Sequence, residues 1–307
     1  MAYGIASEAK PATAGQNKEI FRMGEDTLRE ALAKAGLFHE GAQRIIERGD
    51  EFKHQLEQAI LSVVQGVSIT NQFANEEVAS TYSYLSGYQR PKAIVEQVRR
   101  LQELFPGIGN ANQGLLAQIE SGNALVPSNQ EGFFAFPHWK TVAPTYGEAV
   151  QKVFNLLGQT LSGKFTNYRE GKLGPNYLQE TDRKAWYMQQ IQEEQGSDIL
   201  IVPAQFGLKH RGRSVRRALA VMDGNEFGLG AFEIGIMLLL HPERLAHYDD
   251  LYIDCPGDKV SPGGDGTFPS APYFEFRDRK VRFGTRDVGR ANGRCGSASA
   301  VRLAVPQ

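Results

Sequence analysis

The stretch SDILIVPAQF, Ser197–Phe206, decides the fold class. Its continuous apolar run from Ile199 to Val202, interrupted at Pro203, is typical of a buried strand. Helical periodicity dominates the chain before this stretch. After it, strand-like runs recur at residues 251–253, 273–276 and 281–283, the last two joined by a charged turn. We therefore predict an α+β protein: an N-terminal helical region followed by a mixed or antiparallel sheet with packed helices, its strands lying near residues 198–286.

Several segments have apolar residues at helical spacing. Near the N-terminus these are residues 25–36, 42–49 and 52–64, the first two ending at a glycine. Further helices are predicted at residues 91–104, 115–119 and 146–161, in the Gln/Glu-rich segment that ends at Gln195, and after Ser214. Residues 228–240 are apolar nearly all round, which predicts a central buried helix in which Gly230 and Gly235 allow close approach.

The same pass along the chain divides it into three parts. Residues 1–20, rich in Ala, Thr, Gly and Pro, are expected to be a flexible lead. Residues 21–130 form the predicted helical region, and residues 131–307 form the α+β region. We place the division in the stretch 122–144, which holds prolines and a cluster of aromatic residues. Residues 67–90, rich in Ser, Thr, Asn and Tyr, predict no regular element.

Composition excludes several classes of protein. Hydrophobic residues make up 41% of the chain and charged residues 22%, which is ordinary for a globular protein and unlike a disordered one. No apolar run approaches the roughly 20 residues of a membrane-spanning helix, so we expect no membrane role. Two cysteines are too few for a disulfide framework, and we expect a reducing, cytoplasmic location.

Charge is unevenly distributed although the net charge is only −1. Residues 209–307 carry 15 basic and 12 acidic side chains, an excess of three, whereas the two preceding parts are slightly acidic. Such an excess is too small for a general nucleic-acid coat but permits a local basic patch.

The strongest candidate site breaks a local rule. A helix N-terminus normally attracts acidic residues, yet the predicted cap Ser214 is surrounded by arginines and a lysine. Helix N–H groups and arginine forks together would bind a phosphate or a nucleic-acid backbone. The alternative, of equal weight, is that these cations pair with acidic residues such as Asp249 and Asp250. The predicted phosphate-binding residues are Lys209, His210, Arg211, Arg213, Ser214, Arg216 and Arg217.

Two weaker candidates follow. Asp254, Asp258 and Asp265, in a glycine-rich stretch, offer oxygen ligands suited to Mg²⁺ or Ca²⁺, although a solvated loop is the favoured interpretation. The sequence FPGIG at residues 105–109 is similar to the hairpin of helix-hairpin-helix DNA binders, but Gln113 replaces the small residue of that motif. Familiar catalytic motifs are missing from the sequence, so catalytic residues and cofactors stay unknown.

The segments PAQFGLKHRGRSVRRA and NEFGLGAFEIGIMLLLHPERL, at residues 203–218 and 225–245, carry a resemblance. With them, most of residues 20–300 resembles a family of uncharacterised proteins from uncultivated bacteria with small genomes. That resemblance implies no activity, cofactor or partner.

Three functions therefore remain open. One is a phosphate- or nucleic-acid-backbone-binding protein, with a nucleic acid or a phosphorylated small molecule as its partner. The second is a metal-dependent enzyme that uses the Asp-rich loop. The third is a partner-binding scaffold that uses the helical N-terminus.

Overall fold

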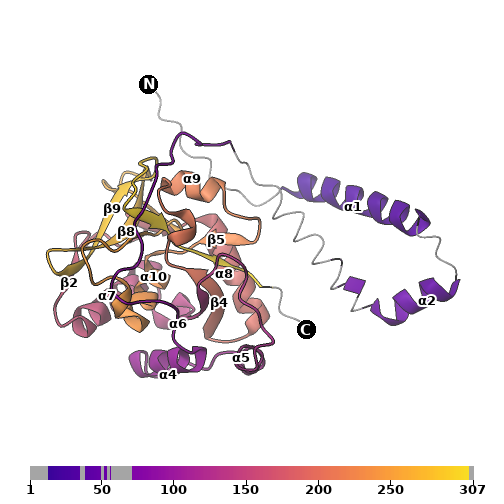
Figure 1. Ribbon diagram of the computed structural model, residues 1–307, viewed down its shortest axis with the longest axis horizontal. Helices are drawn as coiled ribbons and strands as arrows, with labels where there is room; N and C mark the ends of the chain where they lie inside the picture. Colours follow the sequence, from indigo (N-terminus) through magenta and orange to yellow (C-terminus); the bar gives the residue numbers. More distant parts are fainter. Residues whose placement is uncertain (1–12, 35–38, 50–51, 54–55, 57–70, 304–307) are drawn as a thin grey trace.

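The α+β class is confirmed. The computed structural model describes residues 13–34, 39–49, 52–53, 56 and 71–303. Within them, one four-stranded and one seven-stranded sheet form a body with helices from α4 onward. Figure 1 shows these elements, with α1 and α2 beside them. Helices α1 (Ala14–Lys34) and α2 (His39–Glu47) confirm the first two helical runs of the N-terminal region. Most of the third predicted run, residues 52–64, lies outside the described residues.

The four-stranded sheet has the order β1 (Gly132–Pro137), β4 (Ile199–Gln205), β11 (Ser299–Val301) and β5 (Glu226–Gly228). Strand β4 is the predicted buried strand, and every residue in it is buried. Strand β1 pairs antiparallel with residues 199–204 of β4, whereas β11 pairs with β4 only at Ala204 and Gln205. Pro203, which has no N–H to donate, therefore lies beyond the end of the β11 pairing.

Strand β1 contains part of the aromatic cluster where the sequence analysis placed a division. Helices α4 (Ile94–Leu104) and α5 (Gln113–Glu120) precede it, and α4 packs on β1. One hydrophobic core includes Leu101 and Leu116 from these helices together with Phe134 and Ile201 from the sheet. Packing is therefore continuous across residues 130 and 131.

The seven-stranded sheet is mixed, with the order β10-β6-β8-β7-β3 and with β9 joining β2 to β8. Strands β8 and β9 form the predicted antiparallel hairpin, whose turn residues Asp278 and Arg279 both have positive φ, as a tight hairpin turn requires. The strands are β2 (Phe165–Asn167), β3 (Leu178–Glu180), β6 (Tyr252–Asp254), β7 (Asp258–Val260), β8 (Ser270–Arg277), β9 (Lys280–Asp287) and β10 (Cys295–Ser297).

The remaining helices connect and cover the sheets. They are α6 (Trp139–Val142), α7 (Tyr146–Thr160), α8 (Asp182–Gln195), α9 (Val215–Ala220) and α10 (Ala231–Leu240), with one-turn 3₁₀ helices at Leu208–His210 and Pro242–Arg244. Helix α7 begins with a capping box between Thr145 and Glu148. Helix α10 is buried along its whole length, as its apolar sequence predicts, and packs against α7.

The segment without a predicted element has a defined path. Residues 71–93, which we name the strap, run in an extended course over the body toward α4 and appear as a purple trace in Figure 1. Val78 N–H donates to the Gly212 carbonyl over 2.9 Å, and Leu85 N–H donates to Asp250 over 2.7 Å. Hydrogen bonds to the body, rather than pairing into a sheet, hold the strap in place.

Gly235 sets the distance between α10 and α7. A Cβ atom at this position would lie 2.5 Å from Cγ1 of the buried Val153. We expect Gly235→Ala to lower the free energy of unfolding by about 1–3 kcal/mol, because overpacking forces neighbours apart. In urea denaturation, the double variant Gly235→Ala/Val153→Ala should lose less than the sum of the two single losses. Strict additivity would show that the two side chains do not meet.

Candidate functional site

Three arginines of the predicted phosphate site are held by two glutamates of the strap. Arg216 forms an ion pair with Glu76, and Arg217 forms one with Glu77. Nε of Arg213 lies 3.5 Å from Glu77. Hydrogen bonds from Arg217 lower the pKa of Glu77. Burial by itself would raise the pKa of Glu76, but hydrogen bonds from Arg216 and Ser214 outweigh it.

The helix start is also occupied by groups of the chain. Ser214 caps α9 as predicted, since its Oγ accepts a hydrogen bond from Arg217 N–H over 3.1 Å. The same hydroxyl donates to Glu76 over 2.6 Å. The N–H of Arg216 donates to the Val288 carbonyl over 3.0 Å. The N–H groups of Arg216 and Arg217, which a phosphate at this helix start would need, already donate to groups of the protein.

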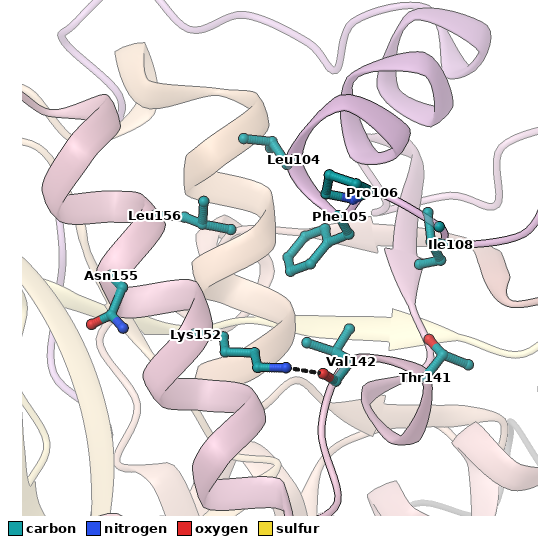
Figure 2. A pocket seen from close by; sticks show the side chains of 10 residues that line it. Leu104, Phe105, Pro106, Ile108, Thr141, Val142, Lys152, Asn155 and Leu156 are labelled. Atoms are coloured by element: carbon teal, nitrogen blue, oxygen red, sulfur yellow. Dashed lines mark hydrogen bonds between the residues drawn. The ribbon is translucent and has the colours of Figure 1, made fainter.

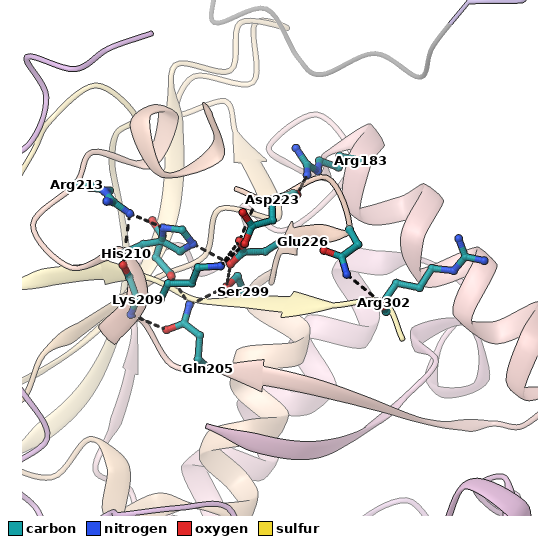
Figure 3. A network of polar contacts seen from close by, with 11 residues as sticks. Arg183, Gln205, Lys209, His210, Arg213, Asp223, Glu226, Ser299 and Arg302 are labelled. Carbon is teal, nitrogen blue, oxygen red and sulfur yellow. Dashed lines mark hydrogen bonds and ion pairs between the residues drawn. The ribbon is translucent and has the colours of Figure 1, made fainter. Parts of the chain in front are cut away.

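Lys209 and His210 belong to a second buried network, centred on Glu226 (Figure 3). Glu226 accepts hydrogen bonds from Lys209 over 2.7 Å, and its other oxygen lies 2.8 Å from His210 Nε2. The Ser299 hydroxyl donates to that same oxygen. Burial would raise the pKa of Glu226, but the His210 and Lys209 contacts lower it to about 2. The Glu226 carboxylate therefore fixes the Lys209 ammonium and the buried His210 ring in place.

These contacts favour the ion-pairing alternative of the sequence analysis but correct its proposed partners. The Asp250 carboxylate accepts hydrogen bonds from the backbone N–H groups of Leu85, in the strap, and of His247. Asp249 forms an ion pair with Arg294. Arg211 is exposed, and its guanidinium donates to the Tyr82 carbonyl over 3.1 Å. The seven residues lie near one another, but five of them, from Arg211 to Arg217, anchor the strap, whereas Lys209 and His210 are held by Glu226.

The structure corrects the expectation that Asp254, Asp258 and Asp265 converge. Asp254 is buried beside Arg286, with 3.3 Å between Oδ1 and Nε. Asp258 is buried among other groups, described below. Asp265 lies in a loop and accepts hydrogen bonds from Ser261 and Thr267. Among the residues that the structure describes, no group of three His, Cys, Asp or Glu side chains could hold a metal ion.

Sequence reasoning missed the most concentrated ionic site. Nζ of Lys184 in α8 lies 2.8 Å from Glu233, 3.2 Å from Asp258 and 3.4 Å from Glu180. The Tyr146 hydroxyl donates to Asp258 over 2.8 Å. We name these five residues the buried ion cluster. Lys184 lies on the buried stripe of α8, one turn before Met188, and this position was the available sequence signal.

The cluster joins α7, α8 and two strands of the seven-stranded sheet, β3 and β7, to the start of α10. Asp258 also accepts Ala231 N–H over 2.7 Å, and Glu233 accepts Gly230 N–H over 3.0 Å. Gly230 is required here, because a Cβ would lie 2.2 Å from Asp258 and 2.3 Å from Lys184. The predicted close approach at Gly230 is therefore confirmed.

Electrostatics of the cluster are those of a structural site. Burial would lower the pKa of Lys184, but Asp258, Glu233 and Glu180 together raise it, so the ammonium stays charged. Burial raises the pKa of Asp258 and that of Glu180. Lys184 and Asp258 are fully enclosed, with side chains 0% exposed, so the described conformation offers a substrate no access to them.

A second buried polar group involves Asp254 and Ser297, which are paired across β6 and β10. Among the described residues, neither Asp254 oxygen nor the Ser297 hydroxyl has a hydrogen-bond partner. Burial raises the pKa of Asp254 to about 6, with Arg286 acting in the opposite direction. Cys295 contacts Arg286 here, and burial raises the pKa of its thiol, so Cys295 is not an activated nucleophile.

A surface hollow lies beside the FPGIG hairpin (Figure 2). It has a volume of about 400 Å³ and is lined by Phe105 and Ile108 on one side and by α7 on the other. Lys152 Nζ points to the Val142 carbonyl, 2.6 Å away, so its charge is engaged. The hairpin N–H of Gly109 donates to Asp198 over 3.0 Å. An acidic side chain thus occupies the donor that a phosphate would use.

Comparisons with known proteins add no assignment: no family model, curated protein or solved structure matches this chain. The resemblance stated from the sequence therefore stays a prediction. Within the part of the chain that the structure describes, no helix is long and apolar enough to span a membrane.

We expect Arg216→Gln to destabilise the protein. If the arginine only opposed the positive end of the helix dipole, its removal would instead stabilise the protein. Glu76 would lose its partner while buried, at a cost of about 1–2 kcal/mol in urea unfolding at pH 7. Because ion pairing lowers the pKa of folded Glu76, this stabilisation is present above the unfolded pKa and is lost as the pH falls through the folded one. The gap between wild type and variant should therefore shrink below about pH 4.5.

Arg211→Gln is the matched control, since Arg211 is exposed, and we expect a loss below about 0.5 kcal/mol. Unchanged stability of Arg216→Gln together with lost salt-dependent binding to DNA or RNA would restore the phosphate hypothesis.

We expect Lys184→Met to lower the free energy of unfolding by about 3–5 kcal/mol, because it leaves buried carboxylates without their cation. Adding Glu233→Leu should recover part of that loss. Arg99→Gln, which breaks an exposed pair with Glu103, is the control and should cost at most about 0.5 kcal/mol. A loss below about 1 kcal/mol for Lys184→Met would contradict the structural role.

Proposed function

We propose that this chain is a partner-binding scaffold, in which α1 docks a partner and the sheet-containing body serves as a rigid base. One observation carries the proposal: α1 exposes large apolar side chains, with Phe21 76% and Ile20 61% exposed. Exposed apolar patches mark interaction sites, because leaving such area in water is unfavourable. Figure 1 shows α1 and α2 beside the body rather than between its layers.

Four of the five large apolar residues of α1 lie on one side of the helix, and Met23 lies on the opposite side. Ile20, Phe21, Leu28 and Leu32 recur at helical spacing and form what we name the α1 apolar face. Glu19, Arg22, Asp26 and Glu30 lie on the other half of the helix. Gly24 lies within the apolar face, and a Cβ placed there would meet open space. This pattern is typical of a helix that packs against a partner.

Features of the body support the role of a base. The strap follows the N-terminal helices along the chain and is fixed by ion pairs at Glu76 and Glu77 and by a hydrogen bond that the Ser86 hydroxyl donates to Asp250. The Tyr84 and Tyr88 hydroxyls both donate to Glu131, which anchors its far end. The strap, which follows α1 and α2 along the chain, is thus fastened to the body at several points.

The proposal is tested by asking whether the α1 apolar face contributes to the free energy of unfolding of the body. Both tryptophans, Trp139 and Trp186, lie in the body, so their fluorescence follows its unfolding. At submicromolar protein, Phe21→Glu should change the free energy of unfolding by less than about 0.5 kcal/mol and should reduce binding of a hydrophobic dye. Phe136→Ala, in the core, should cost about 3–5 kcal/mol. Destabilisation of about 2 kcal/mol or more by Phe21→Glu would mean that α1 is part of the body's core, and the scaffold function would be wrong.

A further inference from the structure

A group of buried polar side chains lies beneath the strap. Arg244 is fully buried, and its guanidinium donates a hydrogen bond from Nη2 to the Leu251 carbonyl over 2.9 Å. His241 is also fully buried, and its carbonyl accepts the Arg244 N–H over 3.0 Å. Among the described residues, Nε and Nη1 of Arg244 and both ring nitrogens of His241 have no hydrogen-bond partner. Buried nitrogen atoms of this kind are unfavourable, so these four atoms mark a place where a hydrogen-bonding ligand would be stabilised.

Two tyrosines of the strap cover this group. The Tyr84 ring lies over the Arg244 guanidinium, with 3.6 Å between the ring centroid and Cζ. The Tyr88 ring contacts the His241 ring, with 5.6 Å between their centroids. Phe206 of the body lies 5.2 Å from the Arg244 guanidinium and 6.4 Å from the His241 ring, measured from its own centroid. Arg244 and His241 therefore belong to one group, and the strap separates it from solvent.

Glu131 does not satisfy Arg244. Its carboxyl accepts hydrogen bonds from the Tyr84 hydroxyl over 2.5 Å, from the Tyr88 hydroxyl over 3.1 Å and from the Phe206 N–H over 3.0 Å. Burial raises the pKa of this carboxyl, with Arg244 acting in the opposite direction. Tyr84 thus contacts both groups, its ring on the guanidinium and its hydroxyl on the carboxyl. In the part of the chain that the structure describes, Arg244 is left without a carboxylate as a hydrogen-bond partner.

The charges around His241 also favour an anion. Burial, and after it the charge of Lys92, lower the pKa of His241 to about 3, so the ring is neutral near pH 7 and one of its nitrogens carries a proton to donate. Glu243, which is 38% exposed, lies 3.6 Å from Nδ1 of His241, beyond hydrogen-bond distance. Arg244 and Lys92 therefore bring two positive charges to a neutral hydrogen-bond donor.

We propose that Arg244 and His241 form an anion-binding site, and that residues 82–88 of the strap open to admit a carboxylate or a phosphate group. Arg244 then forms paired hydrogen bonds with two oxygens of the anion, as a guanidinium does with either group, and His241 donates one more. The rest of the strap stays attached, because its ion pairs at Glu76 and Glu77 lie outside this segment.

The backbone contacts of this segment permit it to open. Ser83 forms a single bridge with Asp250, and its carbonyl accepts the Leu251 N–H over 2.9 Å. The N–H groups of Leu85 and Ser86 donate to the Asp250 carboxylate. Water can replace these few hydrogen bonds when the segment lifts. Hydration of the unpaired nitrogen atoms beneath it offsets their loss.

Isothermal titration calorimetry of the full chain at low ionic strength tests the proposal, with inorganic phosphate and acetate as separate probes. We expect wild type to bind at least one of them, and the probe that binds more tightly identifies the anion as a phosphate or a carboxylate. Tyr84→Ala should raise the affinity for that probe at least about threefold, because the apparent affinity is reduced by the small fraction of chains in which the site is open.

Two substitutions of Arg244 test its role, and circular dichroism shows whether each variant is folded. Arg244→Gln should weaken binding of the probe at least about tenfold, because it removes the charged fork. Arg244→Lys keeps the positive charge and decides the test where Arg244→Gln does not fold. It should weaken binding about fivefold or more, since lysine lacks the planar fork.

Arg211→Gln is the matched control. Arg211 is an exposed arginine that donates to the strap at the Tyr82 carbonyl, so the same substitution outside the site should leave the dissociation constant unchanged within about twofold.

Hydrogen exchange measures the opening itself. With the probe at saturation, the amides of Leu85 and Ser86 should exchange at least about threefold faster than in the free protein, because their hydrogen bonds to Asp250 are broken in the open state. The Val78 amide donates to the Gly212 carbonyl outside this segment, so its exchange rate should stay the same.

The proposal is overturned if neither wild type nor Tyr84→Ala binds phosphate or acetate at about 10 mM. Equal weakening by Arg211→Gln and by the Arg244 variants also overturns it, as does binding that leaves the Leu85 and Ser86 amides unchanged. None of these results involves α1, so they are distinct from a failure of the proposed function, in which Phe21→Glu destabilises the body.

Discussion

The architecture depends on one buried ammonium group. Lys184 holds the carboxylates of Glu180, Glu233 and Asp258, which come from β3, from α10 and from β7. Helix α8 packs on β4 and β5 of the four-stranded sheet, whereas β3 and β7 belong to the seven-stranded sheet. Carboxylates buried together repel one another unless a cation lies between them. The two sheets are thus joined through a charge that neither sheet contains by itself.

The same rule of mutual compensation explains the basic segment that begins at Lys209. Its arginines surround a helix start where they are individually unfavourable. Glu76 and Glu77 of the strap make the electrostatic energy of these arginines favourable, because their carboxylates lie beside the guanidinium groups. A local violation of charge preference is therefore resolved by tertiary structure, and no external anion is needed to account for it.

Sequence reasoning was most successful where periodicity is local. The capped helix α7, the wholly buried α10 and the β8–β9 hairpin each carry their signal within a few residues, and all three were predicted. Strand β1 was missed because prolines and glycines flank its aromatic run. Arg216 and Glu76 are 140 positions apart along the chain, and no periodic pattern links residues at that separation. Lys184 looked like an ordinary charged residue of a polar helix, because its spacing from Met188 and Ile191 is a weak signal among the many Gln and Glu residues of α8.

The order of strands in the four-stranded sheet bears on how the protein is made. Strand β11 lies between β4 and β5, although residues 299–301 are synthesised long after both of them. At about 5–20 residues per second, a ribosome needs roughly 5–20 s to extend the chain from β4 to β11. During that interval β4 and β5 lack a shared neighbour, and their facing edges are open to pairing with other chains. The four-stranded sheet therefore cannot be completed before residues 299–301 are available, which makes its assembly a late step of folding.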